Sequence, residues 1–330
     1  MKGKRRFRSQ KIKIALVAAV LLGSVFSIGV QIGKTRGWPF VKRCGQYWSI
    51  GIYTGRSISS LRSSPNVNNP VLTAEDITDV PAAFLADPFM INHNNKWYMF
   101  FEVWNLETGH GDIGLATSDD GCNWNYEQIV LDEYFHLSYP YVFKWKNEFY
   151  MVPESSKAYS VLLYRAVNFP VEWSFERTLL SGKYVDTSVF RFNKRWWLFT
   201  SEVSSDILRL FYAEDLTGPW AEHPKSPVIE KNASTARPAG RVLVSDGRLI
   251  RFAQDCKPTY GNQVRAFEIT KLGTVDYEEK ELPGGPILKA SGTGWNAEGM
   301  HHLDLHAVDG NEWIGCVDGR RPLLLFGLKY

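Results

Sequence analysis

The feature that most constrains this chain is a phrase that recurs about every fifty residues. Each copy has a small residue, a polar residue and an apolar stretch, followed by an aromatic-rich strand that ends on a second polar residue. Three copies carry it most plainly: Ala86-Asp87-Pro88 with Trp97 to Glu102, Ser138-Tyr139-Pro140 with Phe149 to Glu154, and Val185-Asp186-Thr187 with Trp196 to Ser201. Within each copy the two polar ends lie fifteen residues apart. Such a period, with several short strands per repeat, is typical of a β-propeller, whose blades surround one axis.

Two looser copies complete the set. Ala236-Arg237-Pro238 opens the fourth and Ala297-Glu298-Gly299 the fifth, so successive key positions are 52, 47, 51 and 61 residues apart. The sequence therefore predicts an all-β fold, a five-bladed β-propeller over residues 70–330. The blades are expected near residues 85–133, 136–181, 184–231, 235–289 and 296–330.

The last blade shows only three strands, the third at Leu323 to Leu328, before the chain stops at Tyr330. Its outer strand is expected from the N-terminal side, either at residues 47–53 or near Val71. Closure of this kind leaves no open sheet edge.

A single transmembrane helix is predicted to precede the propeller. Ile14 to Ile32 is an uncharged, mostly apolar run of nineteen residues, which is enough to span a bilayer. The predicted organisation is a basic cytoplasmic tail (1–13), a signal-anchor helix (14–33) and a stalk (34–69). The basic flank places the N-terminus in the cytoplasm and the propeller on the other side, in a periplasm, at a cell surface or in a lumen. A cleaved signal peptide is the alternative, but the run is long and no A-x-A-like site closes it.

The charge distribution and the cysteine spacing exclude some classes of partner and cofactor. The formal net charge is +3, but the first thirteen residues alone carry seven Lys and Arg, so the remainder is slightly acidic and nucleic acid is not an expected partner. The four cysteines show no CxxC and no metal-ligand spacing. No cofactor and no metal ligand are predicted. A structural Ca²⁺ would suit an axial carboxylate cluster, although no ligand loop is visible.

Equivalent positions of the five repeats should converge on the propeller axis. The first set of polar positions comprises Asp87, Tyr139, Asp186, Arg237 and Glu298. The strand ends supply a second set: Glu102, Glu154, Ser201, Gln254 and Asp318. A single acid at a strand end is usually only solvated, but recurrence in register favours a shared cleft. Converging carboxylates suit glycosidic chemistry, in which one protonates the leaving oxygen and another activates water or attacks.

These positions define the candidate site. The candidate catalytic residues are Asp87, Asp186, Glu298 and Glu154. The candidate substrate-binding residues are Glu102, Tyr139, Arg237, Arg241, Gln254 and His301. The two arginines suit an anionic group such as a phosphate or a uronate. His301 and His302 are neighbours on one strand and point to opposite faces, so at most one should reach the cleft.

The blade openings resemble the five-bladed propellers of glycoside hydrolase family 43 and its invertase and levansucrase relatives. In those families a DP-type motif in blade one carries the base, an Asp opening blade three tunes a pKa, and a Glu opening blade four is the acid. Ala86-Asp87-Pro88-Phe89 matches the first motif, and Val185 to Phe190 matches the third with Thr187 in place of Pro. Blade four departs from the pattern, because Arg237 stands where the acid is expected.

A closer resemblance runs from Trp48 to the C-terminus. The phrases Ala86-Asp87-Pro88-Phe89, Val152-Pro153-Glu154-Ser155 and Ala236 to Arg241 are similar to the N-terminal propeller domain of the glucosamine inositolphosphorylceramide transferase family and its free-standing bacterial members. In the plant proteins a separate glycosyltransferase domain follows. This chain ends at Tyr330, so no transferase domain is expected in it.

Two functions follow from these residues and resemblances, and a purely structural protein–protein propeller is a third reading. The first is a membrane-anchored carbohydrate-active enzyme of altered mechanism, acting by hydrolysis or phosphorolysis in cell-envelope or surface glycan metabolism. The second is a non-catalytic glycan-binding or scaffold module of a glycan or glycolipid assembly system. The expected partners are a carbohydrate, an anionic glycan or sugar phosphate, the membrane, and a glycosyltransferase on a separate chain.

Overall fold

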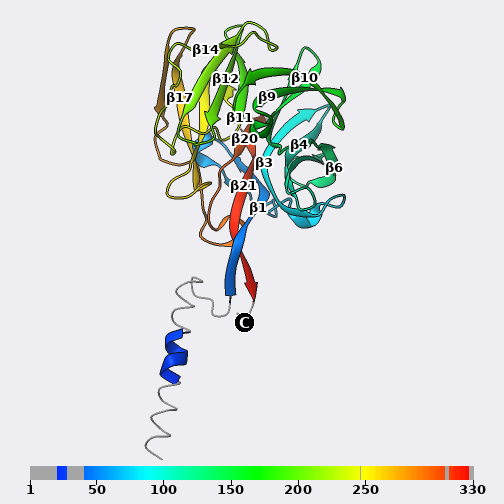
Figure 1. Cartoon of the computed structure of the whole chain (residues 1–330), viewed down its shortest axis with the longest axis vertical. Helices are drawn as coiled ribbons and strands as arrows, with labels where there is room; N and C mark the ends of the chain where they lie inside the picture. Colours follow the sequence, from blue (N-terminus) through cyan, green and yellow to red (C-terminus); the bar gives the residue numbers. More distant parts are fainter. Residues whose placement is uncertain (1–20, 28–40, 246, 309–311, 327–330) are drawn as a thin grey trace, which may run out of the picture. The chain divides into compact units, whose positions relative to one another are not determined.

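A computed structural model describes residues 21–27, 41–245, 247–308 and 312–326. The chain forms two compact units. One comprises residues 47–321, and the other comprises residues 1–46 together with residues 322–330. Within the described residues the strands form five antiparallel sheets, four of them built mainly from consecutive segments (Figure 1). The five-bladed β-propeller predicted from the repeat is therefore confirmed.

Each of the first three blades is a meander of four strands. Blade one contains β3 (Ala82–His93), β4 (Lys96–Asn105), β5 (His110–Ser118) and β6 (Asn125–Leu131). Blade two contains β7 (Ser138–Trp145), β8 (Glu148–Glu154), β9 (Ser160–Asn168) and β10 (Glu172–Ser181). Blade three contains β11 (Tyr184–Phe192), β12 (Arg195–Glu202), β13 (Leu208–Ala213) and β14 (Ala221–Glu222).

Blade four contains β15 (Leu243–Ser245), β16 (Arg248–Asp255), β17 (Gln263–Leu272) and β18 (Tyr277–Glu281), with β19 (Leu288–Lys289) also paired to β17. Four short 3₁₀ helices connect strands elsewhere: η1 (Ile58–Ser60), η2 (Ala74–Asp76), η3 (Ser156–Ala158) and η4 (Gly294–Asn296).

Blade five joins the two ends of the propeller. It runs in the order β2 (Arg62–Ser63), β1 (Val41–Gly55), β21 (Glu312–Phe326) and β20 (Leu303–Val308), and β1 and β21 lie side by side in Figure 1. The segment 47–53 lies within β1. Leu323 to Phe326 continues β21 instead of forming a third strand, so the N-terminal side supplies two strands of this blade and not one. Pairing between β1 and β21 therefore joins the N-terminal and C-terminal parts of the propeller in one blade.

The repeat has a specific backbone conformation. Asp87, Tyr139 and Asp186 have φ values of 53°, 46° and 53°, and each sits at a break in strand register. A left-handed conformation is uncommon outside glycine and costs on the order of 1–3 kcal/mol, so it persists only where the surrounding structure enforces it. Arg237 and Glu298 do not share this conformation. The first three copies are therefore structurally equivalent, whereas the fourth and fifth are not.

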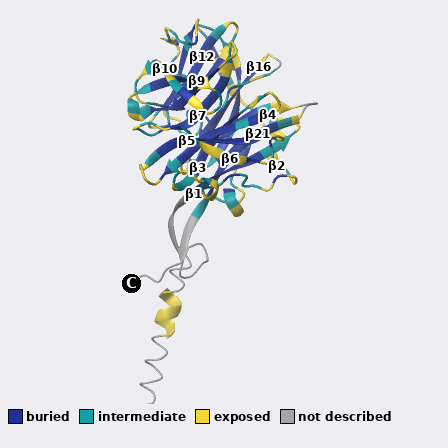
Figure 2. Ribbon diagram, turned by 90° about the vertical axis from the view of Figure 1, so that its right-hand side faces the viewer, coloured by how far each residue is buried: buried dark blue, intermediate teal, exposed yellow. Residues whose placement is uncertain are grey.

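Packing between blades supplies the core, and buried strands lie at the centre of the propeller while exposed residues lie at its rim (Figure 2). The tryptophan that follows the third strand of a blade recurs in this role. Trp173 packs its ring edge-on against Phe100 of blade one at 5.5 Å. The indole N–H groups of Trp124, Trp173 and Trp220 each donate to a backbone carbonyl three or four residues earlier, at 2.9–3.1 Å. The recurring tryptophan is thus a packing residue.

The predicted membrane helix at residues 14–33 lies mostly outside the described residues. Leu21 to Ser27 is helical, and its large apolar side chains are exposed. Over the stretches of chain that the structure describes, no helix has both the length and the apolar character needed to cross a bilayer.

Candidate functional site

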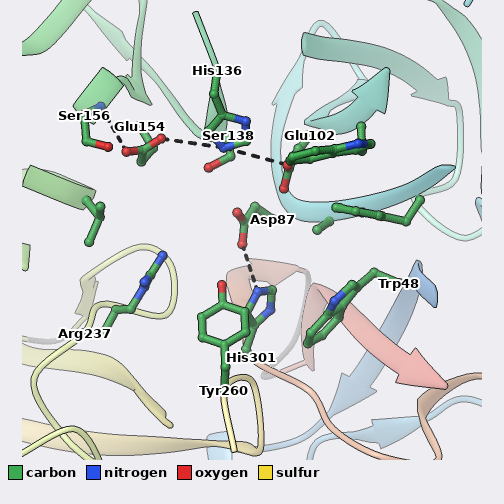
Figure 3. Close-up of a pocket in the computed structure, with 14 residues that line it drawn as sticks. Trp48, Asp87, Glu102, His136, Ser138, Glu154, Ser156, Arg237, Tyr260 and His301 are labelled. Atoms are coloured by element: carbon green, nitrogen blue, oxygen red, sulfur yellow. Dashed lines mark hydrogen bonds and ion pairs between the residues drawn. The ribbon is translucent and has the colours of Figure 1, made fainter. Parts of the chain in front are cut away.

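A cavity of about 270 Å³ opens where the inner strands of the blades begin (Figure 3). Blades one and two supply most of its wall, and blades three, four and five supply the remainder, with Trp48 coming from β1 of blade five. Its lining residues are Trp48, Phe84, Ala86, Asp87, Glu102, Trp104, His136, Ser138, Glu154, Ser156, Val185, Arg237, Tyr260 and His301. Of the predicted site residues, Asp87, Glu102, Glu154, Arg237 and His301 therefore reach one cavity.

Asp87 lies at the centre of this cavity. Its bulged, left-handed backbone turns the side chain out of β3, and its N–H donates to Asp318 Oδ2 at 3.1 Å. The carboxyl group is almost fully buried, and its Oδ1 atom has no hydrogen-bond partner. Burial raises the pKa of Asp87 to about 7, although the positive charge of His301 opposes that rise. Near neutral pH this carboxyl group can therefore both give and accept a proton.

Glu102 and Glu154 face Asp87 from the ends of β4 and β8. Both are buried, and burial raises the pKa of each carboxyl group, with the negative charge of Asp87 adding to the rise at Glu102. The Ser156 N–H donates to Glu154 Oε1 at 3.0 Å, while Glu154 Oε2 has no hydrogen-bond partner. Three carboxyl groups with raised pKa values thus share one cavity.

His136 lies between the two glutamates (Figure 3). Its Nδ1 accepts a hydrogen bond from the Gly111 N–H at 2.9 Å, so the proton of the neutral ring is on Nε2. That Nε2 lies 3.9 Å from Glu102 Oε1 and 3.8 Å from Glu154 Oε2. Burial lowers the pKa of His136 to about 4, so the ring is a neutral donor at physiological pH.

Asp186 and Arg237 form an ion pair with each other. Arg237 Nε donates to Asp186 Oδ2 at 2.6 Å and Arg237 Nη2 donates to Asp186 Oδ1 at 3.2 Å, while Gln254 Nε2 donates to Oδ2 at 2.6 Å. Arg237 Nη1 donates to Ser205 Oγ at 2.9 Å. Asp186 does not line the cavity. The charge of Arg237 is therefore offset by Asp186, which leaves it poorly suited to hold an anionic ligand.

Four other predicted site residues lie away from the cavity: Tyr139, Arg241, Gln254 and Glu298. Gln254 is buried and donates to Asp186 instead. Tyr139 is fully buried, and its hydroxyl bonds Ser188 Oγ and both the N–H and the carbonyl of Gly240, which fixes blade two to blades three and four. Arg241 pairs with the buried Asp304 at 2.8 Å and lines a second cavity of about 390 Å³. Glu298 does not line the first cavity either. Glu298 lies in an irregular segment before β20 and not in a strand, so it does not occupy the same position in its blade as Asp87 does in blade one.

His301 completes the site from blade five. Its Nδ1 lies 2.7 Å from Asp318 Oδ2 and its Nε2 lies 3.7 Å from Asp87 Oδ1. Burial lowers the pKa of His301, but the opposing effect of Asp318 prevails and the net shift is upward. His302 is fully buried behind it, and burial lowers the pKa of that ring to about 4. The two neighbours thus divide into one cavity residue and one packing residue.

Aromatic side chains form the walls of the cavity. Trp48 stacks on His301 with ring centroids 4.2 Å apart, and Phe84 stacks on Trp104 at 5.5 Å. Tyr260 packs edge-on against His301 with ring centroids 5.2 Å apart, and its ring lies 5.2 Å from the Arg237 guanidinium carbon. The repeat did not identify these residues or His136. Phe84, Trp104 and His136 each lie two residues from a repeat position (Ala86, Glu102 and Ser138), which is the one signal that could have found them.

Asp87, His301 and Asp318 bring three ligand atoms within 4.8 Å of one another. Ca²⁺ prefers six to eight oxygen ligands. One donor here is an imidazole, and both oxygens of Asp318 already accept N–H groups. The group fits a hydrogen-bonded acid–base pair better than a Ca²⁺ site.

The fold and the cavity together define a five-bladed β-propeller with an acidic, aromatic-walled cleft at one end. Comparison with solved structures agrees. The catalytic domain of the Coprinopsis cinerea GH62 α-L-arabinofuranosidase superposes with a TM-score of 0.54 at 15% identity, covering 71% of this chain and 90% of that one. A thermostable family-43 glycoside hydrolase superposes with a TM-score of 0.54 at 14% identity, covering 78% and 92%. At these identities the likeness concerns the fold alone.

Sequence comparison gives the family. Residues 43–320 match the model of the family described as "Glucosamine inositolphosphorylceramide transferase 1, N-terminal", and the chain belongs to that family. The protein named glucosamine inositolphosphorylceramide transferase 1 in Oryza sativa subsp. japonica is 38% identical over 83% of this chain, and the one in Arabidopsis thaliana is 37% identical over 83%. The alignments cover 40% and 39% of the length of those relatives.

Proposed function

We propose that the cleft binds a glycan and carries out acid–base chemistry on a glycosidic bond. One observation supports this above all: Asp87, Glu102 and Glu154 converge, buried and with raised pKa values, on one aromatic-walled cavity. Strongly shifted carboxyl groups in a cleft favour a catalytic role over a purely structural one. Aromatic faces suit the apolar faces of sugar rings, while the carboxyl groups suit their hydroxyls.

The chemistry follows from the different environments of the carboxyl groups. Burial raises the pKa of Glu102 well above its ordinary value, which favours Glu102 for the role of the acid that donates to the leaving oxygen. Asp87 has a pKa of about 7 and is partly ionised at neutral pH. In its ionised form, supported by His301, it accepts the proton of an attacking water or phosphate. Glu154 and the Nε2–H of His136 orient the sugar hydroxyls.

The substrate class follows from the charge of the cleft. Arg237 is a permanent cation of the cavity wall, and Asp186 already offsets it at 2.6 Å. Those carboxyl groups that are ionised would favour an ammonium group over a phosphate. The names of the rice and Arabidopsis relatives contain glucosamine. We therefore favour a glycoside of an amino sugar over the sugar phosphate expected from the two arginines.

The test is turnover by the purified chain. The substrates are nitrophenyl glycosides, glucosaminides among them, and amino-sugar oligosaccharides, each assayed with and without inorganic phosphate. Glu102→Gln and Asp87→Asn should lower kcat/KM by about 10²–10⁴-fold, the usual range for a lost general acid or base. Asp119→Asn replaces an exposed acid of blade one and is the matched control. Turnover that is absent, or equal in all variants, would refute the catalytic proposal.

A second candidate function is glycan binding without catalysis, in a scaffold that serves a glycosyltransferase on a separate chain. It is favoured by Arg237, which stands where the resemblance to family 43 expects an acid and which neutralises Asp186. Calorimetric titration with amino-sugar oligosaccharides separates the two functions. Binding that is weakened in Trp48→Ala, in a protein without turnover, would support the second.

We also propose that residues 14–33 anchor the propeller on the extracytoplasmic side of a membrane. The support is the uncharged run from Ile14 to Ile32 and its basic flank. Fractionation of cells that express the full chain, or a chain lacking residues 1–34, tests it. Recovery of the full chain without membranes would refute it.

A further inference from the structure

A second group of metal-ligating side chains lies outside the cleft, at the start of β5. His110, Asp112 and Asp132 place one ligand atom each within 4.8 Å of one another. His110 and Asp112 are on β5, whereas Asp132 follows β6 directly, in the connection that leads to β7. The group therefore joins two segments of blade one that the sequence separates by twenty residues.

One ligand atom in this group is buried and has no hydrogen-bond partner. Asp112 is 1% exposed, and its Oδ2 accepts from Asn105 Nδ2 at 2.9 Å. Its Oδ1 is buried without a hydrogen bond. A buried carboxylate oxygen without a donor is costly. A cation placed between Asp112 Oδ1 and the neighbouring Asp132 and His110 would supply the missing partner.

The separation of two of the ligand atoms is compatible with a small tetrahedral ion. His110 Nδ1 lies 3.3 Å from Asp112 Oδ1. Ligand atoms held 2.0–2.2 Å from a tetrahedral Zn²⁺ lie about 3.3–3.6 Å from each other. One imidazole and two carboxylates are donors that Zn²⁺ accepts, whereas Ca²⁺ and Mg²⁺ prefer oxygen ligands alone. His110 is half-buried and Asp132 is exposed, so an ion can enter from solvent.

We propose that His110, Asp112 and Asp132 bind a divalent transition-metal ion, Zn²⁺ by preference, which fastens the β6–β7 connection to β5. This connection also carries His136, four residues after Asp132. Gly111, between the two ligands on β5, donates its N–H to His136 Nδ1 at 2.9 Å. A bound ion therefore rigidifies the segment that carries His136. It acts through the backbone of residues 110–112 and 132–136 and does not itself contact the cleft.

Calorimetry on the full chain, first stripped with a chelator, tests the site with Zn²⁺, Mn²⁺ and Ca²⁺ in separate titrations. One equivalent of Zn²⁺ should bind, more tightly than Mn²⁺ and with Ca²⁺ weakest, and should raise Tm. Co²⁺ in place of Zn²⁺ should give the visible absorption bands of a tetrahedral site. His110→Gln and Asp132→Asn should each weaken Zn²⁺ binding at least tenfold. Asp132 is exposed, so its variant should fold normally.

Asp119→Asn is the matched control, an exposed acid at the other end of β5, and should bind Zn²⁺ like the unmodified chain. The proposal is overturned if no ion binds, or if His110→Gln and Asp132→Asn bind as tightly as the control. It is also overturned if Zn²⁺ binding is retained in both but lost in His301→Gln, because the ion would then occupy the Asp87, His301 and Asp318 group.

Discussion

The ion pair between Asp186 and Arg237 allows a quantitative prediction. Asp186 has a side-chain exposure of 1% and Arg237 one of 16%, and two hydrogen bonds at 2.6 and 3.2 Å join them. Arg237→Gln leaves the carboxylate buried with Gln254 as its one remaining side-chain donor. Removing one partner of a buried pair costs about 3–5 kcal/mol. Because the bond to Gln254 remains, we expect the free energy of unfolding to fall by an amount at the lower end of this range, about 3 kcal/mol.

The assay is urea unfolding followed by tryptophan fluorescence and by circular dichroism. Arg195→Gln is the matched control, because Arg195 pairs with Glu214 at the surface, and such pairs contribute about 0–1 kcal/mol. The double variant Asp186→Asn with Arg237→Gln should recover much of the loss, since no buried charge is then unpaired. Asparagine tolerates the left-handed backbone of Asp186. A loss for Arg237→Gln no larger than that of the control would refute the reasoning.

Three further predictions concern the same molecule. The pKa of Asp87 is raised to about 7, so the folded state holds its proton longer than the unfolded state and the stability from this group falls as pH rises from about 4 to 7. Asp87→Asn should therefore raise Tm more at pH 8 than at pH 4, and an equal change at both would contradict this. Gly111→Ala should lose about 1–3 kcal/mol in urea unfolding, because a Cβ there would lie 2.4 Å from a backbone oxygen, whereas Gly273→Ala, with open space, should be neutral. Tyr139→Phe should cost about 1–3 kcal/mol in the same assay because its buried hydroxyl bonds two blades, and the exposed Tyr134→Phe should cost nothing measurable.

The repeat predicted the first three blades well, because three levels of information agree there. Spacing, strand pattern and the position of the polar residue coincide, and the structure gives Asp87, Tyr139 and Asp186 the same bulged, left-handed conformation. The predicted convergence of Asp87 with Glu102 and Glu154 follows from this register.

The repeat predicted the site less well in the blades whose first segment is not a regular strand. Glu298 and Arg237 occupy repeat positions in sequence, but irregular chain leads into their blades, and Glu298 lies outside the cavity. Tyr139 has the repeat conformation, yet its long side chain reaches Gly240 across the axis and not the cleft. Side-chain length and direction decide these cases, and neither is visible in a spacing.

The sequence by itself determined the number of blades, the three equivalent openings and the acidic residues that could meet at the axis. A fixed period sets where each strand begins, and this is enough to specify a closed ring of sheets. Only the tertiary structure decided which charged side chains form ion pairs with each other and which face the cavity. Asp186 and Arg237 are 51 residues apart in the chain and neutralise each other in space, whereas Asp87, Glu102 and Glu154 face a cavity whose aromatic walls come from β1, blade one and blade four. Charge pairing depends on distances of a few ångströms between different blades, and no local pattern encodes those distances.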